Sequence, residues 1–341
     1  MAYFDVMEYY LKKIRKMNYL RKYKEIVYVP NLYGVFQFFL LKNRLINNVF
    51  IFHDRFRDEF SAQFDSLNLI NKSPLLCYLL IKWFSLWNRQ AVIYLSGEMR
   101  YTNFFLKCFK NIVYLEDGVA SYEKINDKSR QIVQRRKSII KHLILGRIYP
   151  WFGMASQVKK IYLTGILPVP EIVREKVELI NLKQLWEQKT PKEQDEIKRL
   201  FIPDKFNMDE MNGRDIILLT QPFSEYSGGN FSESDKIEVY RCLVSDYDES
   251  RLIIKPHPSE KTCYQSYFSD SYILTIYCPF ELLLFMGCKI STAISVNSTA
   301  IFTLDDSIKK VISGYDVTSA LIEEAKRRNI YDGISNKFKT K

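Results

Sequence analysis

The sequence has few of the residues that build common metal and cofactor sites. It contains three histidines and six cysteines, and no Cys-x-x-Cys pair. No set of histidines, cysteines and carboxylates has metal-ligand spacing, and no glycine-rich phosphate loop is present. These absences argue against a zinc module, a dithiol redox motif and a P-loop. The scattered cysteines, several of them in apolar runs, fit a reducing compartment.

A long hydrophobic run is also missing. The most apolar stretch, Leu75 to Trp87, covers about 13 residues, contains Lys82 and is too short to span a bilayer. The stretch from Met1 to Tyr23 is polar, basic and aromatic, without the apolar segment of a signal peptide. We therefore expect a cytoplasmic protein that touches, at most, the inner face of the cell membrane.

What the chain does have is length and positive charge. Its 341 residues are enough for two domains, and its formal net charge is +11. Such a charge favours an anionic partner, namely nucleic acid, lipid headgroups or a phosphorylated substrate. No signature of the usual nucleic-acid-binding modules is present, so no nucleic-acid partner is expected.

Short apolar strands alternate with helices along the chain, which indicates βαβ units and parallel sheets. The predicted strands are 26–29, 49–52, 91–95, 112–115 and 161–163, then 215–220, 252–255, 271–276, 290–296 and 311–312. We predict an α/β protein with two Rossmann-like domains facing a central cleft. The domains cover 1–160 and 205–341, joined by a connecting segment over 161–204.

Two further helices are expected from composition. Ser129 to Ile148 is strongly basic and reads as a helix, and Val177 to Leu200 is polar and reads as a solvated connecting helix.

The stretch Arg251 to Pro258 organises the second half of the chain. Four apolar or basic residues read as a strand, and Pro256 and Pro258 must end it. Lys255 and His257 would then emerge at the carboxyl edge of a parallel sheet, where ligands bind. Lys255 could neutralise a phosphate, and His257 could donate a hydrogen bond or a proton to a departing phosphate oxygen. The alternative is a turn with a surface histidine.

A second motif, Glu116-Asp117-Gly118, follows the fourth predicted strand. Gly118 allows a sharp turn with positive φ, which would leave Asp117 at the sheet edge as a general base. The alternative is a plain Asp-Gly turn.

A third motif, Asn297-Ser298-Thr299, lies between a predicted strand and a helix. Ser298 or Thr299 could cap this helix, whose N–H groups would bind an anion. Glu281, early in the preceding helix, could bind a ribose diol or merely favour the helix N-terminus. The alternatives are a helix cap without a ligand for Ser298 and Thr299, and a carboxylate that only stabilises the helix N-terminus for Glu281.

Two acidic positions remain. Asp235 opens a predicted helix, and capping is the favoured reading. Asp246-Tyr247-Asp248 mimics the Asp-x-Asp metal motif of other sugar transferases, but it lies in a polar turn at the opposite sheet edge and reads as solvated.

Taken together, these motifs resemble bacterial sialyltransferases of the GT-B type, most closely glycosyltransferase family 52, the lipooligosaccharide and capsule sialyltransferases. Family 80 and the polysialyltransferases have similar motifs. The shared set is an acidic pair before glycine, then His-Pro, then Ser-Ser or Ser-Thr. Here these are Glu116-Asp117-Gly118, His257-Pro258 and Ser298-Thr299, in that order. The run Leu218 to Pro222 also resembles family 52.

The resemblance implies an inverting, metal-free transfer of sialic acid from CMP-sialic acid to a galactose hydroxyl, without a cofactor. It implies Asp117 as general base, with Asp235 as the alternative base, and His257 as the group assisting the departing CMP. The residues implied in donor binding are Gln221, Lys255, Pro258, Glu281, Ser298, Thr299 and Gly118.

The resemblance also implies a galactose-terminated glycan of the cell surface as acceptor and allows a homodimer, because family members form domain-swapped dimers. An acceptor on a lipid carrier would explain the basic stretch from Ser129 to Ile148. The competing hypotheses are another GT-B enzyme with a different activated donor, such as a capsule polymerase, and a non-catalytic scaffold at the membrane surface.

Overall fold

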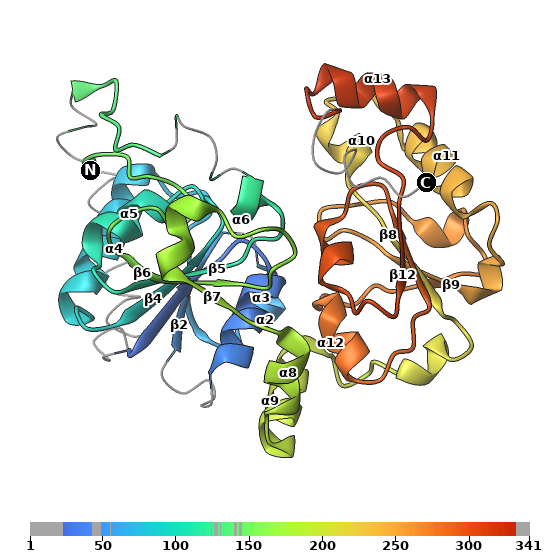
Figure 1. Ribbon diagram of the computed structural model, residues 1–341, viewed down its shortest axis with the longest axis horizontal. Coiled ribbons are helices and arrows are strands. Elements are labelled where there is room, and N and C mark those ends of the chain that lie inside the picture. Colours follow the sequence, from blue (N-terminus) through green and yellow to red (C-terminus); the bar gives the residue numbers. More distant parts are fainter. Residues whose placement is uncertain are drawn as a thin grey trace, which may run out of the picture. The chain divides into compact units, whose positions relative to one another are not determined.

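The structure is a computed structural model that describes residues 23–42, 49–54, 56–123, 125, 129, 131–139, 142 and 145–331. The chain divides into two compact units, Met1–Leu200 and Phe201–Lys341. Each unit is built on one parallel sheet with helices packed against it, which confirms the predicted α/β class (Figure 1).

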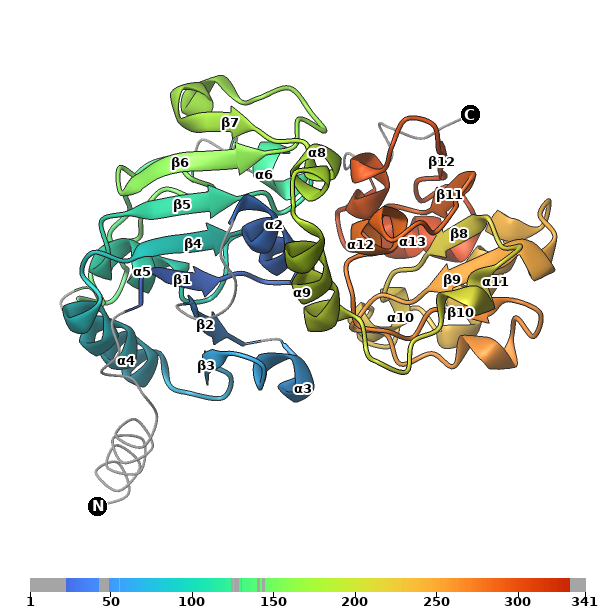
Figure 2. The same cartoon turned by 90° about the horizontal axis from the view of Figure 1, so that it is seen from below.

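The sheet of the first unit has seven described strands in the order β3-β2-β1-β4-β5-β6-β7, which Figure 2 shows from one face. Every pairing in it is parallel. The strands are β1 (Glu25–Tyr28), β2 (Val49–His53), β3 (Asp65–Asn68), β4 (Val92–Ser96), β5 (Ile112–Leu115), β6 (Val158–Leu163) and β7 (Val177–Leu179). The order reverses at β1, so the loops after β1 and β4 leave the sheet toward opposite faces, and ligands commonly bind at such a point.

Helices cover both faces of this sheet (Figure 1). Tyr28 and Phe52 pack with α4 and α5 in one core, whereas Phe38 of α2 meets Tyr94 on the other face. The described helices are α2 (Leu32–Leu41), α3 (Asp58–Ser61), α4 (Pro74–Trp87), α5 (Thr102–Cys108), α6 (Ala120–Glu123), the 3₁₀ helix η3 (Glu171–Lys176), α8 (Leu182–Glu187) and α9 (Pro191–Phe201).

The second unit has five described strands in the order β10-β9-β8-β11-β12, again all parallel. They are β8 (Ile216–Leu219), β9 (Leu252–Lys255), β10 (Tyr272–Ile273), β11 (Thr292–Ser295) and β12 (Lys309–Ile312). The described helices are η4 (Met208–Met211), α10 (Phe223–Tyr226), α11 (Glu233–Val244), η5 (Glu249–Arg251), η6 (Tyr264–Ser266), α12 (Phe280–Phe285), η7 (Thr299–Thr303) and α13 (Ser319–Arg327). The order reverses at β8, between β9 and β11.

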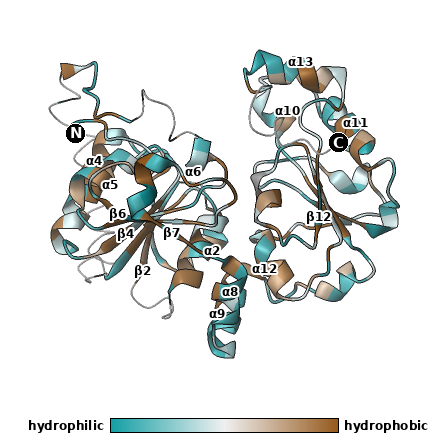
Figure 3. Cartoon of the chain, in the orientation of Figure 1, coloured by the Kyte–Doolittle hydropathy of each residue, from teal (hydrophilic) through white to brown (hydrophobic). Residues whose placement is uncertain are grey.

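Local sequence accounts for where several helices begin. The side chains of Asn31, Ser73, Ser232 and Thr318 each accept a backbone N–H at the start of α2, α4, α11 and α13. Strands buried on both faces are almost wholly apolar, as the brown strands in Figure 3 show, because each is covered by helices above and below.

The predicted connecting segment over 161–204 differs from the structure. Its first part forms β6 and β7, which extend the first sheet, because Ile161 and Leu163 pair with Val177 and Leu179. The predicted helix from 177 to 200 is instead β7 followed by α8 and α9. Asn181 caps α8, and Pro191 is the first residue of α9.

The predicted basic helix from Ser129 to Ile148 is present only in part: the described residues 139, 142 and 145 are helical, and the N–H groups of His142 and Gly146 donate to the carbonyls of Ser138 and His142. Residues 131–138 are not helical, and Gln134 pairs with Ile148 in an antiparallel bridge. Ile132 and Val133 are 63% and 48% exposed, so residues 131–138 have no buried apolar face to hold a helix against the protein. Residues 130, 140, 141, 143 and 144 of this prediction lie outside the described residues.

Within the described part of the chain, no helix is both long enough and apolar enough to cross a membrane.

Candidate functional site

In the first unit, Asp117 lies in a cluster made by the loops after β1, β4 and β5. The Nδ2 group of Asn31 donates to Asp117 Oδ1 at 3.2 Å. Gly97, with φ of 59°, lies so close that a Cβ built on it would be 2.3 Å from Asp117 Oδ2. The carboxylate is therefore held between an amide donor and the bare backbone of a glycine.

The neighbouring Glu116 anchors this turn through buried hydrogen bonds. Its side chain is fully buried, and its carboxylate accepts from Tyr122 Oη at 2.6 Å, Thr164 N–H at 2.7 Å and Tyr33 Oη at 3.3 Å. Burial raises the pKa of Glu116, and these hydrogen bonds act in the opposite direction. Glu116 is a structural carboxylate, and its position leaves Asp117 as the residue of the acidic pair that is not fully buried.

The backbone of the same turn is also fixed. Glu116 O accepts from Gln37 Nε2 at 2.9 Å and from Ser96 Oγ at 3.1 Å, while the N–H of Asp117 donates to Ser121 Oγ at 2.7 Å. Gly118 has φ of 55°, so the predicted left-handed glycine is confirmed. Asp117 and Gly118 are consequently held in one defined geometry.

In the second unit, the predicted donor-site residues follow three adjacent strands. Gln221 comes after β8, Lys255 and His257 come at the end of β9, and Ser298 comes after β11. Because the strands are parallel, all four residues lie at the carboxyl edge of the sheet, on both sides of the point where the strand order reverses. This arrangement agrees with the position predicted for His257.

The surroundings of His257 determine both the tautomer of its neutral ring and the direction in which its pKa is shifted. Its Nδ1 accepts the N–H of Ser259 at 3.2 Å, so in the neutral ring the proton is on Nε2. Burial lowers the pKa of His257, the positive charge of Lys255 lowers it further, and Glu225 raises it to a smaller degree. At neutral pH the ring is therefore mainly neutral and presents one donor, Nε2–H.

Lys255 and Gln221 are held by main-chain contacts nearby. Lys255 Nζ donates to the carbonyl of Cys278 at 3.1 Å. The N–H of Gln221 donates to Tyr240 Oη at 2.6 Å, and Tyr240 Oη donates to the carbonyl of Gln221 at 3.1 Å. Pro258 is exposed in the turn that the Glu260 N–H closes on the carbonyl of His257 at 2.9 Å. The ammonium group of Lys255 thus lies at the same edge of the sheet as His257.

Ser298 and Thr299 differ from the prediction in one respect. Thr299 is the first residue of the five-residue 3₁₀ helix η7, and Ser298 stands at its N-cap position, but the Ser298 side chain makes no capping hydrogen bond. The N–H of Ser298 donates instead to Ser295 Oγ at 2.9 Å. The predicted capping role of Ser298 is therefore wrong, because Ser295 ties the Ser298 backbone to the end of β11.

Two predicted acidic residues have clear structural partners. Glu281 is 4% exposed, and its Oε1 accepts from Thr303 Oγ1 at 2.7 Å. Asp235 forms a capping box with Ser232: its Oδ2 accepts from the N–H of Ser232 at 2.7 Å, and its own N–H donates to Ser232 Oγ at 3.1 Å. Hydrogen bonds from Ser232 lower the pKa of Asp235. The favoured capping interpretation of Asp235 agrees with this geometry.

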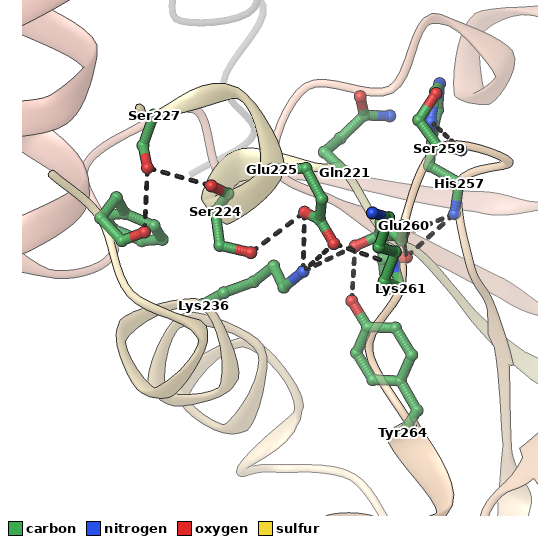
Figure 4. A network of polar contacts seen from close by, with 12 residues as sticks. Gln221, Ser224, Glu225, Ser227, Lys236, His257, Ser259, Glu260, Lys261 and Tyr264 are labelled. Atoms are coloured by element: carbon green, nitrogen blue, oxygen red, sulfur yellow. Dashed lines mark hydrogen bonds and ion pairs between the residues drawn. The ribbon is translucent and has the colours of Figure 1, made fainter. Parts of the chain in front are cut away.

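A buried network beside His257 was missed by sequence reasoning (Figure 4). The side chain of Lys236 is 0% exposed and lies between the carboxylates of Glu225 and Glu260. Glu260 lies three residues after His257, and Lys236 follows the capping Asp235 on the buried side of α11. Neither residue belongs to a recognisable motif, so only its burial could have drawn attention to it.

The described residues contain no group of three or more His, Cys, Asp or Glu side chains arranged to hold a metal ion.

The model of glycosyltransferase family 52 matches residues 50–318. An uncharacterized protein of Haemophilus influenzae is 36% identical over 215 residues, which cover 63% of this chain and 65% of that protein. The match therefore spans slightly less than two thirds of that relative.

Two solved structures share the fold. An alpha/beta-galactoside alpha-2,3-sialyltransferase from Photobacterium phosphoreum has a TM-score of 0.57 and 11% identity, with coverage of 92% of this chain and 97% of the other. The GT-B domain of a sialyltransferase from Photobacterium damselae has a TM-score of 0.54 and 12% identity, with coverage of 89% and 97%. At this identity the likeness concerns the fold alone, and it confirms the predicted GT-B type.

Proposed function

Because the chain belongs to glycosyltransferase family 52, we propose that it is a sialyltransferase that moves sialic acid from CMP-sialic acid to a galactose hydroxyl with inversion. The observation that carries the proposal is the state of His257, a neutral imidazole with its Nε2–H as the only ring donor, beside Lys255 at the carboxyl edge of the second sheet. A neutral donor beside a cation suits a phosphate that acquires charge as it departs.

The proposed reaction has two proton-handling groups. Asp117 accepts the proton of the acceptor hydroxyl while that oxygen forms a bond to the anomeric carbon of sialic acid. The bond from this carbon to the CMP phosphate breaks, and its electron pair leaves with CMP. The Nε2–H of His257 donates a hydrogen bond to the departing oxygen, and the charge of Lys255 stabilises the phosphate.

Asp117 is the preferred base over Asp235 for a geometric reason. Asn31, which also caps α2, donates to Asp117 Oδ1, and Gly97 leaves room for Asp117 Oδ2. Asp235, in contrast, is engaged in the capping box with Ser232, whose hydrogen bonds lower its pKa and make it a weaker base.

The remaining donor contacts are assigned by position and resemblance. Ser298, Thr299, Pro258 and Gln221 would hold the CMP part, Gly118 would border the reacting centre, and Glu281 would bind the ribose. The proposed linkage is α-2,3, as in the name of the Photobacterium phosphoreum neighbour. We propose that no metal or cofactor is needed, because the cation and the donor described above supply the charge stabilisation.

The acceptor is proposed to be a galactose-terminated lipooligosaccharide or capsule glycan at the inner face of the cell membrane, and the protein a cytoplasmic, peripheral enzyme. Arg135 and Arg136 lie between the exposed Ile132 and Ile139, and this mixture of basic and apolar groups suits anionic headgroups. A homodimer is part of the same proposal and is measurable by sedimentation.

The proposal is tested by incubating the protein with CMP-sialic acid and lactose, with and without EDTA. We expect sialyl-lactose and CMP in both reactions. His257→Asn and Asp117→Asn should each lower kcat by roughly 10²- to 10⁴-fold, the usual size of one acid or base contribution. Absence of CMP release from the unaltered protein would contradict the transfer, and strict dependence on a divalent ion would contradict the metal-free mechanism.

The second candidate is a GT-B enzyme with another activated donor, such as a capsule polymerase. Thermal-shift measurements with CMP, UDP and GDP separate the two. Stabilisation by CMP alone is expected, and stabilisation by UDP or GDP alone would favour the second candidate.

A further inference from the structure

A buried network of charged side chains lies directly under the His257 turn. Lys236 Nζ donates to both oxygens of Glu225, at 2.9 Å each, and lies 3.6 Å from Glu260 Oε1. The side chains of Lys236 and Glu260 are 0% exposed, and that of Glu225 is 15% exposed. Burying three ionisable groups is costly unless they are paired, so the pairing of Lys236 with both carboxylates offsets this cost.

Both carboxylates of the network reach the backbone of the turn from His257 to Lys261 (Figure 4). Glu260 Oε2 accepts the N–H of His257 at 2.6 Å. Glu225 Oε1 accepts the N–H of Lys261 at 3.0 Å. Lys236 therefore joins the two groups that hold the two ends of this turn.

The other amides of the turn are also satisfied internally. Pro258 has no N–H, Ser259 donates to His257 Nδ1 at 3.2 Å, and Glu260 donates to the carbonyl of His257 at 2.9 Å. Every backbone N–H from His257 to Lys261 is thus bonded within the protein. None of these amides is left for an anion, so the turn can engage an anion only through side chains, among them the imidazole Nε2–H of His257.

Glu260 has further partners that fix it on the sheet. Its Oε1 accepts from Tyr264 Oη at 2.6 Å, and its Oε2 also accepts from Thr220 Oγ1 at the end of β8. Thr220 Oγ1 in turn lies 3.3 Å from the N–H of His257, so β8 and the turn share one hydrogen-bonded corner. This corner sets the direction in which His257 leaves β9.

We propose that Glu225, Lys236 and Glu260 are positioning residues for His257: they hold the His257–Lys261 turn so that Ser259 keeps the ring in the Nε2–H tautomer, aimed out of the sheet edge. The inference rests on the proposed function for its catalytic meaning, but the tautomer and orientation of the ring are properties of the protein itself. None of the three residues touches substrate in this role.

The test variants are chosen so that each removes a specific hydrogen bond or ion pair of the network. In Glu260→Gln one acceptor oxygen becomes an NH₂ group, so Tyr264, Thr220 and His257 cannot all keep an acceptor. In Glu225→Gln the paired contact with Lys236 is lost. Asp215→Asn is the matched control: Asp215 accepts from Arg251 at 2.9 and 2.7 Å and from Ser291 at 2.6 Å, at the opposite end of the same strands.

The first measurement is NMR of the histidine rings, which is practical because the chain has three histidines and His257→Asn assigns the signal. We expect the Nε2–H tautomer for His257 in the unaltered protein and in Asp215→Asn. In Glu260→Gln and Glu225→Gln the ring should show mixed tautomers. Glu225→Gln should also lower the pKa of His257, because it removes a negative charge that raises it.

The second measurement is kinetic. Glu260→Gln and Glu225→Gln should lower kcat on the order of tenfold to a hundredfold, with CMP affinity changed less than about threefold, because positioning affects the reaction more than binding. Asp215→Asn should lower the melting temperature without this change in kcat.

The outcomes separate the two proposals. The inference would be overturned if the Glu225 and Glu260 variants had a lower melting temperature but an unchanged kcat and an unchanged tautomer and pKa of His257. The network would then be purely structural. The expected ring changes in a protein that transfers nothing from CMP-sialic acid would support the positioning role and contradict only the proposed function.

Discussion

At the scale of single residues, the reactive groups are placed by neighbours that have no reactive chemistry. Asn31 donates to one oxygen of Asp117, and Gly97 makes room for the other. Ser259 fixes the tautomer of His257 through its backbone N–H. Small or neutral residues at these positions hold the reactive groups without adding a charge that would shift their pKa values.

Gly97→Ala tests the placement of Asp117. The new Cβ would lie 2.3 Å from Asp117 Oδ2 and should displace the carboxylate. We expect kcat of transfer to fall on the order of 10²-fold, as misplacement by about 1 Å can cause, while CMP still binds. The readouts are initial rates and CMP titration.

Gly213→Ala is the control for that variant. Gly213 also has a positive φ, 80°, but nothing lies within 4 Å of its added Cβ. It should lose roughly 1 kcal/mol of stability through backbone strain and keep its kcat. Equal kcat values for the two alanine variants would contradict the role assigned to Gly97.

A second residue, His53, predicts a pH dependence of stability. It is 2% exposed at the end of β2, and burial lowers its pKa to about 4, with a smaller lowering by Lys72 that Asp58 opposes. The unfolded chain takes up this proton near pH 6.5, whereas the folded chain does not. The free energy of unfolding should therefore decrease as the pH is lowered, by about 1 kcal/mol from pH 7.5 to pH 5.5.

Urea unfolding of His53→Gln at both pH values isolates this contribution, since Glu116 and Glu260 titrate in both proteins. The variant should lose about 1 kcal/mol less than the unaltered protein over the same interval. Parallel losses in the two proteins would show that His53 is protonated in the folded state.

At the scale of elements, the starts of helices decide which acidic residues are available for chemistry. α11 begins with a capping box in which Ser232 and Asp235 satisfy each other's backbone N–H groups. η7, in contrast, has Ser298 at its N-cap position, whose side chain makes no capping hydrogen bond. The same residue types thus have different roles at the carboxyl edge of one sheet.

Ser232→Ala and Asp235→Ala test whether Asp235 is more than a cap. Each should lower the free energy of unfolding by about 1 kcal/mol, the usual cost of losing an N-cap bond, and leave kcat unchanged. Denaturation and initial rates are measured on both variants. A large loss of kcat in Asp235→Ala, absent from Ser232→Ala, would move the general base from Asp117 to Asp235.

At the scale of the whole molecule, the formal net charge of +11 concerns encounter with the donor more than the chemical step. CMP-sialic acid carries a phosphate and a carboxylate. Raising ionic strength from about 20 to about 300 mM should increase the KM for the donor several-fold, because screening shortens the range of attraction. The KM for neutral lactose is the internal control, and a donor KM that is insensitive to salt would refute charge steering.

Much of this protein follows from its sequence because strands buried on both faces must be apolar. β1, β2, β4, β5, β8, β9 and β11 read directly as such runs, and motifs that follow parallel strands must lie at the carboxyl edges of their sheets. The polar β3 and the short β7 give no such signal, since edge strands gain their stability from pairing with a neighbour.

The sequence by itself determined the α/β class, the order of the three motifs and the position of His257 after β9. Only the tertiary structure decided that Asn31 and Gly97 meet Asp117 and that Lys236 joins Glu225 to Glu260 beneath the His257 turn. The reason is that strand periodicity is local, whereas the partners of a buried charge come from distant segments and become identifiable only when burial forces them together.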